Sequence, residues 1–279
     1  MCSSDLTTGA LQMRKITLTL ISLALCLAAL TPLFAEAQST TCQKHFVDGK
    51  PPTFVRASLQ SKTVALCYEA FAVMHSGVSR TPLWSAEHLT RSSLAQAREV
   101  KRKDAFHAEE ALPADLRAEL SDYAHSGYDR GHMSPAADMP TEESQQQSFS
   151  LANIVPQTSE HNQILWSAIE GATRHLVNQR GELFVITGPV FEGDRIARIN
   201  GRVFIPTHIF KAVYDPFKKE GAAWLSPNLA GDAYEIVSLS ELEKRIGISL
   251  FPSVPADIKS KTINLPEPRI RSRKRDDGR

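Results

Sequence analysis

The feature that most constrains this chain is the stretch Gly127–Met139, which has Asp129-Arg130-Gly131-His132 near its start. Arg130 carries a permanently charged planar fork that suits phosphate oxygens, and His132 can hold or release a proton near neutral pH. Gly131 lets the backbone turn tightly or approach a neighbour closely. Any one of these residue types in a loop is usually a solvated surface residue without a functional role. Together they fit attack on a phosphodiester, provided that a second segment supplies partners.

A helix is predicted downstream, from Ser159 as its N-cap to Arg180, because this segment has no proline and a single glycine. At about 100° per residue, most of its aliphatic side chains fall on one arc. The opposite arc carries Asn162, Trp166, Glu170 and Arg174, with Val177 as an apolar exception. Taken alone, Glu170 and Arg174 are equally well explained as a solvated i,i+4 ion pair worth only a few tenths of a kcal/mol.

Three stretches together resemble one known family. They are Asp129-Arg130-Gly131-His132, then Ser150 to Gln157, then Asn162-Gln163-x-x-Trp166-x-x-x-Glu170. Asn162 follows His132 by 30 residues and Glu170 follows Asn162 by eight. Order, spacing and residue types are similar to those of the DNA/RNA non-specific endonucleases, which are ββα-metal (His-Me finger) enzymes that include secreted bacterial nucleases and mitochondrial endonuclease G. The resemblance covers roughly residues 65–250.

The resemblance implies an α+β fold, with a central antiparallel sheet flanked by helices and a ββα-metal active-site motif. Strand-like stretches occur at 64–68, 70–74, 83–86, 182–190, 208–214 and 222–225. Short helices are expected at 114–124 and 239–246, and another opens at Thr141. The second strand of the ββα unit is expected from Phe149 to Ile154, with Pro156 ending it.

The resemblance and the chemistry assign the reacting groups residue by residue. His132 is expected to be the general base that takes a proton from the attacking water. Asn162 is expected to be the single protein ligand of one divalent ion, Mg²⁺ with Mn²⁺ as a substitute, because Mg²⁺ prefers oxygen ligands and keeps several waters. Glu170 is expected to act through the ion's water shell on the leaving 3′ oxygen. Activity is expected to fall below about pH 6, where an ordinary imidazole protonates.

The phosphate is expected to be gripped by arginines. Arg130 and Arg174 would hold its non-bridging oxygens, and Arg102 in the basic run at 98–103 is the candidate for a further contact, with Arg98 as the alternative. Asn153 is expected to hydrogen-bond near the phosphate or to steady the site. Asp129 is interpreted as a structural carboxylate rather than an acid catalyst.

Composition places few limits on this function. The chain has 279 residues, 42% of them hydrophobic and 23% charged, as in ordinary globular proteins. Its formal net charge is only +1, so the attraction for a polynucleotide has to come from a local cluster and a metal ion. The two cysteines outside the N-terminal leader lack the spacing of a zinc site.

The N-terminal residues are typical of an export signal. Met13-Arg14-Lys15 precedes the uncharged run 16–30, and Ala35-Glu36-Ala37 offers a cleavage site. Residues 1–37 are therefore interpreted as a signal peptide, with Met13 as the true start, and an uncleaved anchor is the alternative. The mature protein would be secreted or periplasmic, without stable membrane association. Cleavage would leave Cys42 and Cys67, which predict one disulfide worth about 3 kcal/mol in the chain-entropy model.

The mature chain is expected to hold one endonuclease domain, residues 38–258, and a basic, disordered tail, residues 259–279. The tail fits a polyanion-binding arm and a solubilising segment equally well. The expected function is hydrolysis of DNA and RNA with little sequence specificity, giving 5′-phosphorylated products.

Several alternatives stay open. The nuclease could serve as an antibacterial toxin, the fold could carry a catalytically silent nucleic-acid-binding or adhesion protein, or the substrate could be another phosphodiester such as a nucleotide conjugate. The sequence also leaves open a homodimer, an inhibitor protein and any preference between DNA and RNA.

Overall fold

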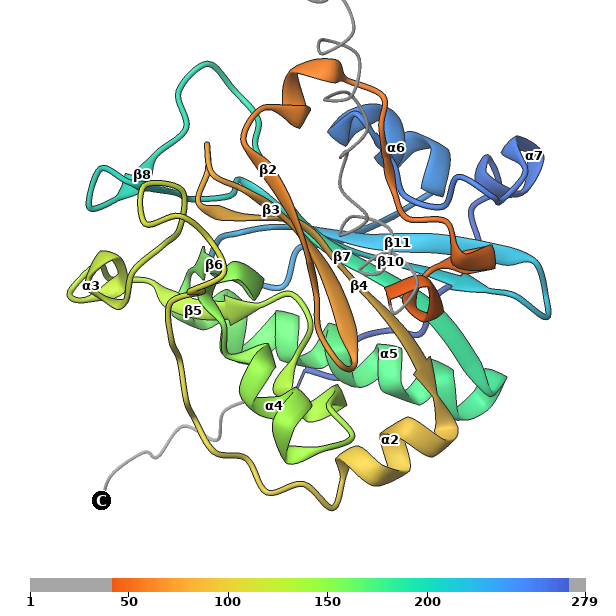
Figure 1. Cartoon of the computed structure of the whole chain (residues 1–279). Coiled ribbons are helices and arrows are strands. Elements are labelled where there is room, and N and C mark those ends of the chain that lie inside the picture. Colours follow the sequence, from red (N-terminus) through yellow and green to blue (C-terminus); the bar gives the residue numbers. More distant parts are fainter. Residues whose placement is uncertain (1–41, 271–279) are drawn as a thin grey trace, which may run out of the picture. The chain divides into compact units, whose positions relative to one another are not determined.

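A computed structural model describes residues 42–270, so the predicted signal peptide and residues 271–279 lie outside the described part. Its centre is a seven-stranded sheet in the order β12-β11-β10-β7-β4-β3-β2, in which all neighbours are antiparallel (Figure 1). The strands are β2 (Thr63–Cys67), β3 (Phe71–Ser76), β4 (Thr81–Thr90), β7 (Glu182–Val190), β10 (His208–Asp215), β11 (Glu220–Pro227) and β12 (Glu235–Val237). The predicted α+β class with a central antiparallel sheet is confirmed.

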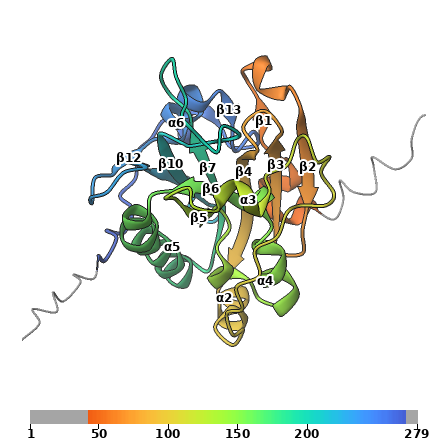
Figure 2. The same cartoon turned by 90° about the vertical axis from the view of Figure 1, so that its left-hand side faces the viewer.

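Alternating side chains divide the interior into two cores, one on each face of the sheet. On β10, Phe210 and Ala212 pack in the core that includes helix α6 (Leu239–Ile246). Ile209 and Val213 pack in the core that includes helix α5 (Ser167–Arg180). This period of two is what a sheet buried on both faces requires. Figures 1 and 2 show α6 and α5 on opposite sides of the sheet.

A small ββα unit lies on the α5 side. It consists of β5 (Asp129–His132), paired antiparallel with β6 (Ile154–Gln157), and the helix that follows. The expected second strand, Phe149 to Ile154, was placed too early. Ser150 accepts a hydrogen bond from the Ala152 N–H and opens a 3₁₀ turn, Leu151–Asn153, so pairing begins only at Ile154. Pro156 is tolerated inside β6 because that strand has a single neighbour.

The helix of this unit differs from a regular α-helix in its first turns. His161–Trp166 form a π-helix, which runs directly into α5. Backbone hydrogen bonds in a π-helix span one residue more than those in an α-helix. The side chains of this segment therefore do not follow the directions predicted for a regular α-helix. Trp166, expected on the polar arc, is 1% exposed in the core. Ser159 is not the expected N-cap, because its hydroxyl donates to Asp129 Oδ1 instead.

Shorter elements complete the described chain. The helix expected at 114–124 is confined to its last part, α3 (Leu120–Tyr123), whereas α4 (Glu142–Ser148) begins as expected behind Thr141, whose side chain caps it. The other helical elements are Gln43–His45, Val47–Gly49, Ala57–Gln60, α2 (Arg91–Ala97), Ala136–Asp138 and α7 (Ala256–Lys259). The other strands are β1 (Thr53–Phe54), β8 (Arg198–Ile199), β9 (Val203–Phe204) and β13 (Ile248–Ser249).

The predicted disulfide between Cys42 and Cys67 is present and ties the start of the described chain to the end of β2. At the other end, packing continues past Ile258, where the domain was expected to stop. Lys259 forms an ion pair with Glu243, and Leu265 is 6% exposed in the core beneath α5. The hydrophobic side chains at 263 and 265 account for this extension. Within residues 42–270, no helix has the length and apolar character needed to cross a membrane.

Candidate active site

Three side-chain donors hold Asp129, and all of them come from residues 159–163, at the start of the helix of the ββα unit. Its Oδ2 accepts hydrogen bonds from Asn162 Nδ2 at 3.0 Å and from Gln163 Nε2 at 2.9 Å. Its Oδ1 accepts one from Ser159 Oγ at 2.7 Å. Burial acts to raise the pKa of the Asp129 carboxyl, but these hydrogen bonds outweigh it and hold that pKa below its usual value. Because the Asn162 amide nitrogen is committed to Asp129, its amide oxygen is the atom left to bind a ligand.

Glycine is required at position 131 because the side chain of Gln157 packs directly against its backbone. A Cβ atom at this position would lie 1.9 Å from Gln157 Oε1. Gln157 is fully buried and its Nε2 lies 2.7 Å from His161 Nδ1, so it cannot easily move aside. The glycine therefore lets β5 and β6 pack tightly where the helix begins.

His132 lies in an aromatic cage at the other end of β5. Its ring centroid is 5.3 Å from that of Phe106 and 5.0 Å from that of Phe149. The side chain is 8% exposed, and Nε2 is buried without a hydrogen-bond partner among the described residues. Burial, with smaller contributions from Arg102 and Arg130, lowers the pKa of His132 to about 3. The imidazole is therefore neutral at neutral pH and able to accept a proton.

Two arginines cover this cage from the solvent side. The Arg130 guanidinium carbon lies 4.2 Å from the centroid of Phe106, and that of Arg102 lies 5.4 Å from the centroid of Phe149. Both side chains are exposed, and Arg102 Nε donates to Asp104 at 2.7 Å. Arg98 lines the same groove as Arg102 but has no contact with the cage. Of the two upstream candidates, Arg102 is thus the one that lies beside His132.

Glu170 and Arg174 project from α5. Burial raises the pKa of Glu170 above its usual value, and the charges of Arg174 and Lys211 offset this only in part. Arg174 Nη1 donates to Asp138 Oδ1 at 2.9 Å, and Asp138 is 3% exposed. Sequence reasoning assigned no role to Asp138, although it lies within the stretch singled out first. Its place in that stretch was the available signal, because its partner Arg174 is distant in the sequence.

Asn153 serves the framework of the site. It is fully buried, its Oδ1 accepts from the Ser134 N–H, and its Nδ2 donates to the carbonyls of Ser134 and Ser148. No polar atom of this side chain is free for a phosphate, so of the two expected roles the structure fits only the steadying one. Asn153 fixes the chain immediately after His132.

Five of the predicted residues form two groups, separate from the Glu170, Arg174 and Asp138 side chains. Asp129 and Asn162 belong to one, and His132, Arg130 and Arg102 belong to the other. Among the described residues, no hydrogen bond joins His132 to Asn162 or Glu170. The groups are connected by strand β5, which carries both Asp129 and His132, and by the charge of Arg102, which acts on both His132 and Glu170.

A buried polar layer underlies the site on the sheet face toward α5. Ser85, Thr187 and Lys211 are cross-strand neighbours on β4, β7 and β10, and Lys211 Nζ donates to Thr187 Oγ1 at 2.7 Å. Glu87 is 1% exposed, and neither carboxylate oxygen has a hydrogen-bond partner among the described residues. Burial, and next the charge of Asp138, raises the pKa of Glu87 well above its usual value. The charge of Lys211 offsets this upward shift only in part.

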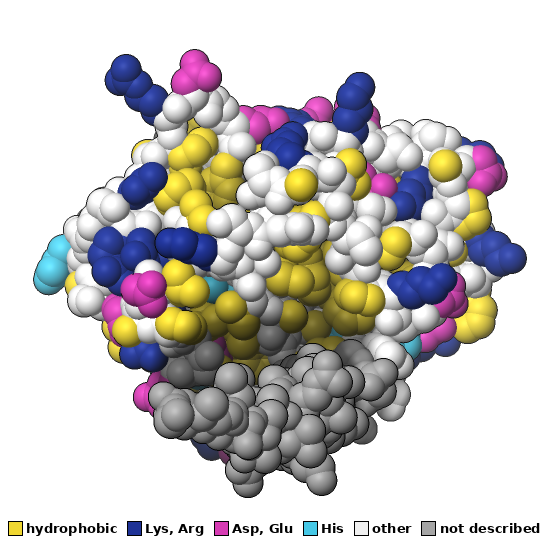
Figure 3. Space-filling view, turned by 45° about the horizontal axis from the view of Figure 1, so that its top comes forward, with side chains coloured by type: hydrophobic (Ala, Val, Ile, Leu, Met, Phe, Trp, Pro, Cys, Tyr) yellow, Lys and Arg dark blue, Asp and Glu magenta, His cyan; other side chains and the backbone are white. Residues whose placement is uncertain are grey.

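Positive charge is concentrated locally rather than over the whole molecule. Figure 3 shows Lys and Arg side chains in several separate groups on the face in view, interspersed with Asp and Glu. This agrees with a net charge of +1. By contrast, Arg98, Arg102 and Arg174 line one groove that has no acidic side chain in its lining.

The donor chemistry around Asn162 fits a hydrated divalent cation. Its free amide oxygen is a hard ligand of the kind that Mg²⁺ prefers. No cluster of three or more His, Cys, Asp or Glu side chains that could hold a metal occurs within residues 42–270. An ion here would thus keep most of its water shell, as Mg²⁺ and Mn²⁺ can.

The chain is similar in sequence to known nucleases. A sequence profile of the DNA/RNA non-specific endonuclease family matches residues 51–257. The chain is 32% identical over 203 residues to nuclease C1 of Cunninghamella echinulata var. echinulata, a match that covers 66% of this chain and 81% of that protein. It is 32% identical over 216 residues to the mitochondrial nuclease of Saccharomyces cerevisiae, covering 67% of this chain and 65% of the yeast protein.

A solved structure shares the fold. The crystal structure of the EndoG/EndoGI complex contains a chain that superimposes with a TM-score of 0.61 at 23% sequence identity. The match covers 70% of this chain and 88% of the other. At this level of identity the likeness concerns the fold alone.

Proposed function

The chain belongs to the DNA/RNA non-specific endonuclease family, and from this premise we propose that it hydrolyses DNA and RNA with little sequence specificity and leaves 5′-phosphorylated products. The observation that carries the proposal is the buried imidazole of His132, whose Nε2 has no hydrogen-bond partner within residues 42–270 and which lies beneath two exposed guanidinium groups. A base next to phosphate-binding arginines is what attack on a phosphodiester requires.

In the proposed mechanism, His132 Nε2 takes a proton from the attacking water, and the new P–O bond forms as the bond to the 3′ oxygen breaks. Arg130, Arg102 and Arg174 neutralise charge on the non-bridging oxygens. Glu170 holds a water that protonates the leaving 3′ oxygen. Asn162, oriented by Asp129, would hold Mg²⁺, or Mn²⁺ in its place. When bound, the ion would supply charge neutralisation at the phosphate and the leaving oxygen.

Substrate has to displace part of the cover over His132. The Nε2 atom of His132 is shielded in the free protein. Arg102, one of the two arginines over the cage, forms an ion pair with the exposed Asp104, two residues further along the chain. Both side chains of this pair are about 60% exposed, at 58% and 62%, so such a pair adds little stability. We therefore propose that phosphate attracts Arg102 away from Asp104 and opens the path of water to His132.

Low sequence specificity follows from the kind of contacts available. The proposed binding groups are guanidinium groups that face phosphate, and such contacts carry no base information. Export to the periplasm or medium is proposed from residues 1–37, and N-terminal sequencing of the exported protein should start at Gln38. An inhibitor protein is proposed as a partner because the solved neighbour is a nuclease–inhibitor complex.

The direct test digests supercoiled DNA, single-stranded DNA and RNA side by side, with a Mg²⁺ and Mn²⁺ series and with chelator. The proposal expects all three to be cut with metal and none with chelator, and expects 5′-phosphate ends on the products. Binding without cleavage at any metal concentration would favour a silent nucleic-acid-binding protein. Cleavage of small nucleotide conjugates alone would favour another phosphodiesterase.

A further inference from the structure

Two grooves meet on the exposed side of helix α5. The first, groove A, has a volume of about 460 Å³ and lies between the segment after α2 and the helix. Its walls carry Arg98 and Arg102 on one side and Arg174 and His175 on the other. Arg102 and Arg174 belong to the proposed phosphate site, so groove A begins at the scissile phosphate.

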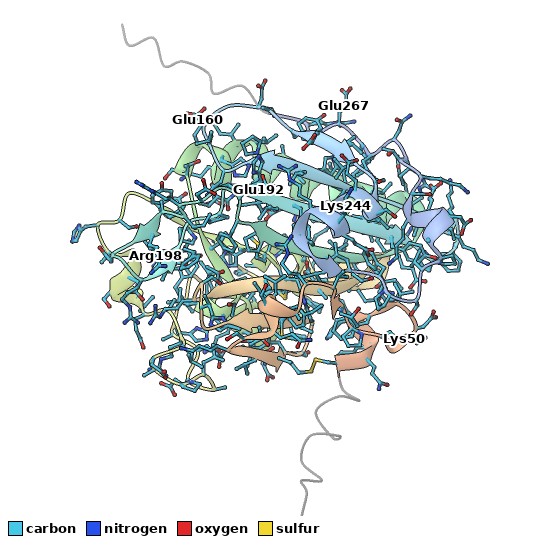
Figure 4. All side chains as sticks on the ribbon, turned by 90° about the horizontal axis from the view of Figure 1, so that it is seen from above. Lys50, Glu160, Glu192, Arg198, Lys244 and Glu267 are labelled. Carbon is cyan, nitrogen blue, oxygen red and sulfur yellow. A yellow bond between two sulfur atoms is a disulfide. The ribbon has the colours of Figure 1, made fainter. Side chains whose placement is uncertain are left out.

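The second, groove B, has a volume of about 960 Å³ and lies between the helix and the C-terminal segment 266–269. Its floor consists of helix side chains from Gln163 to His175, which are small or polar apart from Ile164. Its far wall is Pro266-Glu267-Pro268-Arg269, which is anchored by the burial of Leu265 in the core. Figure 4 shows Glu160, at the start of the helix, and Glu267 along the same edge of the molecule.

Gly171 is the point at which the grooves join. Gly171 and His175 line both of them. Glycine is a poor helix former, and nothing in the structure demands it here: Gly171 has ordinary helical geometry, and a Cβ atom would meet no atom within 4 Å. Because position 171 has no side chain, the surface of α5 between the two grooves is low. A large side chain there would separate the grooves.

We propose that groove A and groove B form one track for a strand of the polynucleotide, which leaves the scissile phosphate at Arg102 and Arg174, crosses α5 at Gly171 and passes beneath the C-terminal segment. This rests on the proposed function. The charges fit a phosphate backbone: Arg98, Arg102 and Arg174 line groove A, Arg269 lines groove B, and Glu267 is the sole acidic side chain in either lining.

The first experiment blocks the crossing with Gly171→Leu. Two substrates are compared: a single-stranded oligonucleotide long enough to follow the track, and bis(p-nitrophenyl) phosphate, which fills only the reaction centre. The ratio of kcat/KM for the oligonucleotide to that for the small diester is expected to fall at least tenfold, through a higher KM for the oligonucleotide. Gly171→Ala should melt at or above the wild-type temperature, which shows that the position accepts a side chain.

Ala95→Leu is the matched control. Ala95 is exposed on α2 and lines neither groove, so the same added bulk should leave the ratio unchanged. A Gly171→Leu enzyme with the wild-type ratio would overturn the proposed track. Failure of the wild-type enzyme on both substrates would instead overturn the proposed function, so the two failures are distinguishable.

The second experiment counts phosphate contacts in groove B. Removing a lysine or arginine that contacts a phosphate of a single strand should reduce the slope of log affinity against log salt concentration by about 0.7. Arg269→Gln is expected to do this for the oligonucleotide, measured with chelator present to prevent cleavage. Lys244→Gln, on α6 and away from that edge in Figure 4, removes the same charge and should leave the slope unchanged. Equal slopes for both variants would contradict the passage of the strand beneath Arg269.

Discussion

The side-chain amide of Asn162 donates a hydrogen bond of 3.0 Å to Oδ2 of Asp129. This bond fixes which end of the amide faces Asp129 and leaves the amide oxygen as the end that can bind the proposed ion. Asp129 also accepts hydrogen bonds from Gln163 and Ser159, so its carboxylate holds the first turn of the helix of the ββα unit in place. These hydrogen bonds fit the sequence-based interpretation of Asp129 as a structural carboxylate, and we propose that it positions Asn162 for the ion.

Replacing Asp129 with Asn should weaken metal binding more than it weakens the fold. The new amide can present an N–H to Asn162 and favour the opposite orientation of its side chain. We expect the Mg²⁺ concentration for half-maximal activity to rise at least tenfold, with partial rescue at high Mg²⁺. Ser159→Ala is the control, because it removes a bond to the other oxygen and leaves the Asn162 bond in place. An unchanged Mg²⁺ requirement in Asp129→Asn would contradict this role.

The pH dependence should differ from the simple expectation that activity falls below about pH 6. That expectation assumed an ordinary imidazole, whereas burial lowers the pKa of His132 to about 3, so the base stays neutral well below pH 6. The pKa of Glu170 is shifted upward by burial, so Glu170 is the first of the two to take up a proton as pH falls. The acid limb of kcat/KM should therefore report Glu170 rather than His132, and Glu170→Gln should shift it. An acid limb that is the same in the wild type and in Glu170→Gln would contradict this.

Removing one ring of the aromatic cage around His132 should shift the acid limb of kcat/KM. Phe106→Ala removes a ring 5.3 Å from His132 and admits water to the imidazole. Since burial is the main cause of the lowered pKa, exposure should raise the pKa of His132 toward 6.5. The acid limb of kcat/KM should then shift toward the pH at which an ordinary imidazole protonates. Phe217→Ala, at a side chain that is 74% exposed, should leave the profile unchanged. Identical profiles for the two variants would show that the cage does not set this pKa.

Glu87 should make stability depend on pH. Its pKa is raised in the folded state, so the folded protein binds more protons than the unfolded chain between the two pKa values, and stability falls as pH rises through that window. Glu87→Gln mimics the protonated carboxyl. The variant should match the wild type near pH 5 and have a higher Tm than the wild type at pH 8. Glu110→Gln, at an exposed side chain, is the control. The same Tm difference at both pH values would argue against a protonated Glu87.

Regular elements were predicted well where the residue pattern was strong. The strand at 182–190 and the helix at 239–246 occur with the predicted bounds, because an apolar run ended by turn residues and an amphipathic helix are both local signals. The helix at 159–180 was also found, but its π turn was not, since the extra residue per turn has no sequence signature. For that reason the burial of Trp166 could not be foreseen.

The site was predictable as a set of residue types but not as a set of contacts. The motif around His132 and the spacing to Asn162 identified the chemistry. The cage of Phe106 and Phe149 depends on an irregular segment packing against a turn, and the raised pKa of Glu87 depends on neighbours from three elements. Such long-range contacts are decided by tertiary packing, which local patterns do not encode.

The central claim is that His132 is the base of a polynucleotide hydrolase. It is tested most directly by measuring the rate at which wild type and His132→Ala cut supercoiled DNA and RNA with Mg²⁺ present, alongside thermal melts of both proteins. We predict that the variant melts as a folded protein and loses roughly 10²- to 10⁴-fold in rate, the usual contribution of a general base. A folded His132→Ala enzyme that cuts both substrates at close to the wild-type rate would contradict the account.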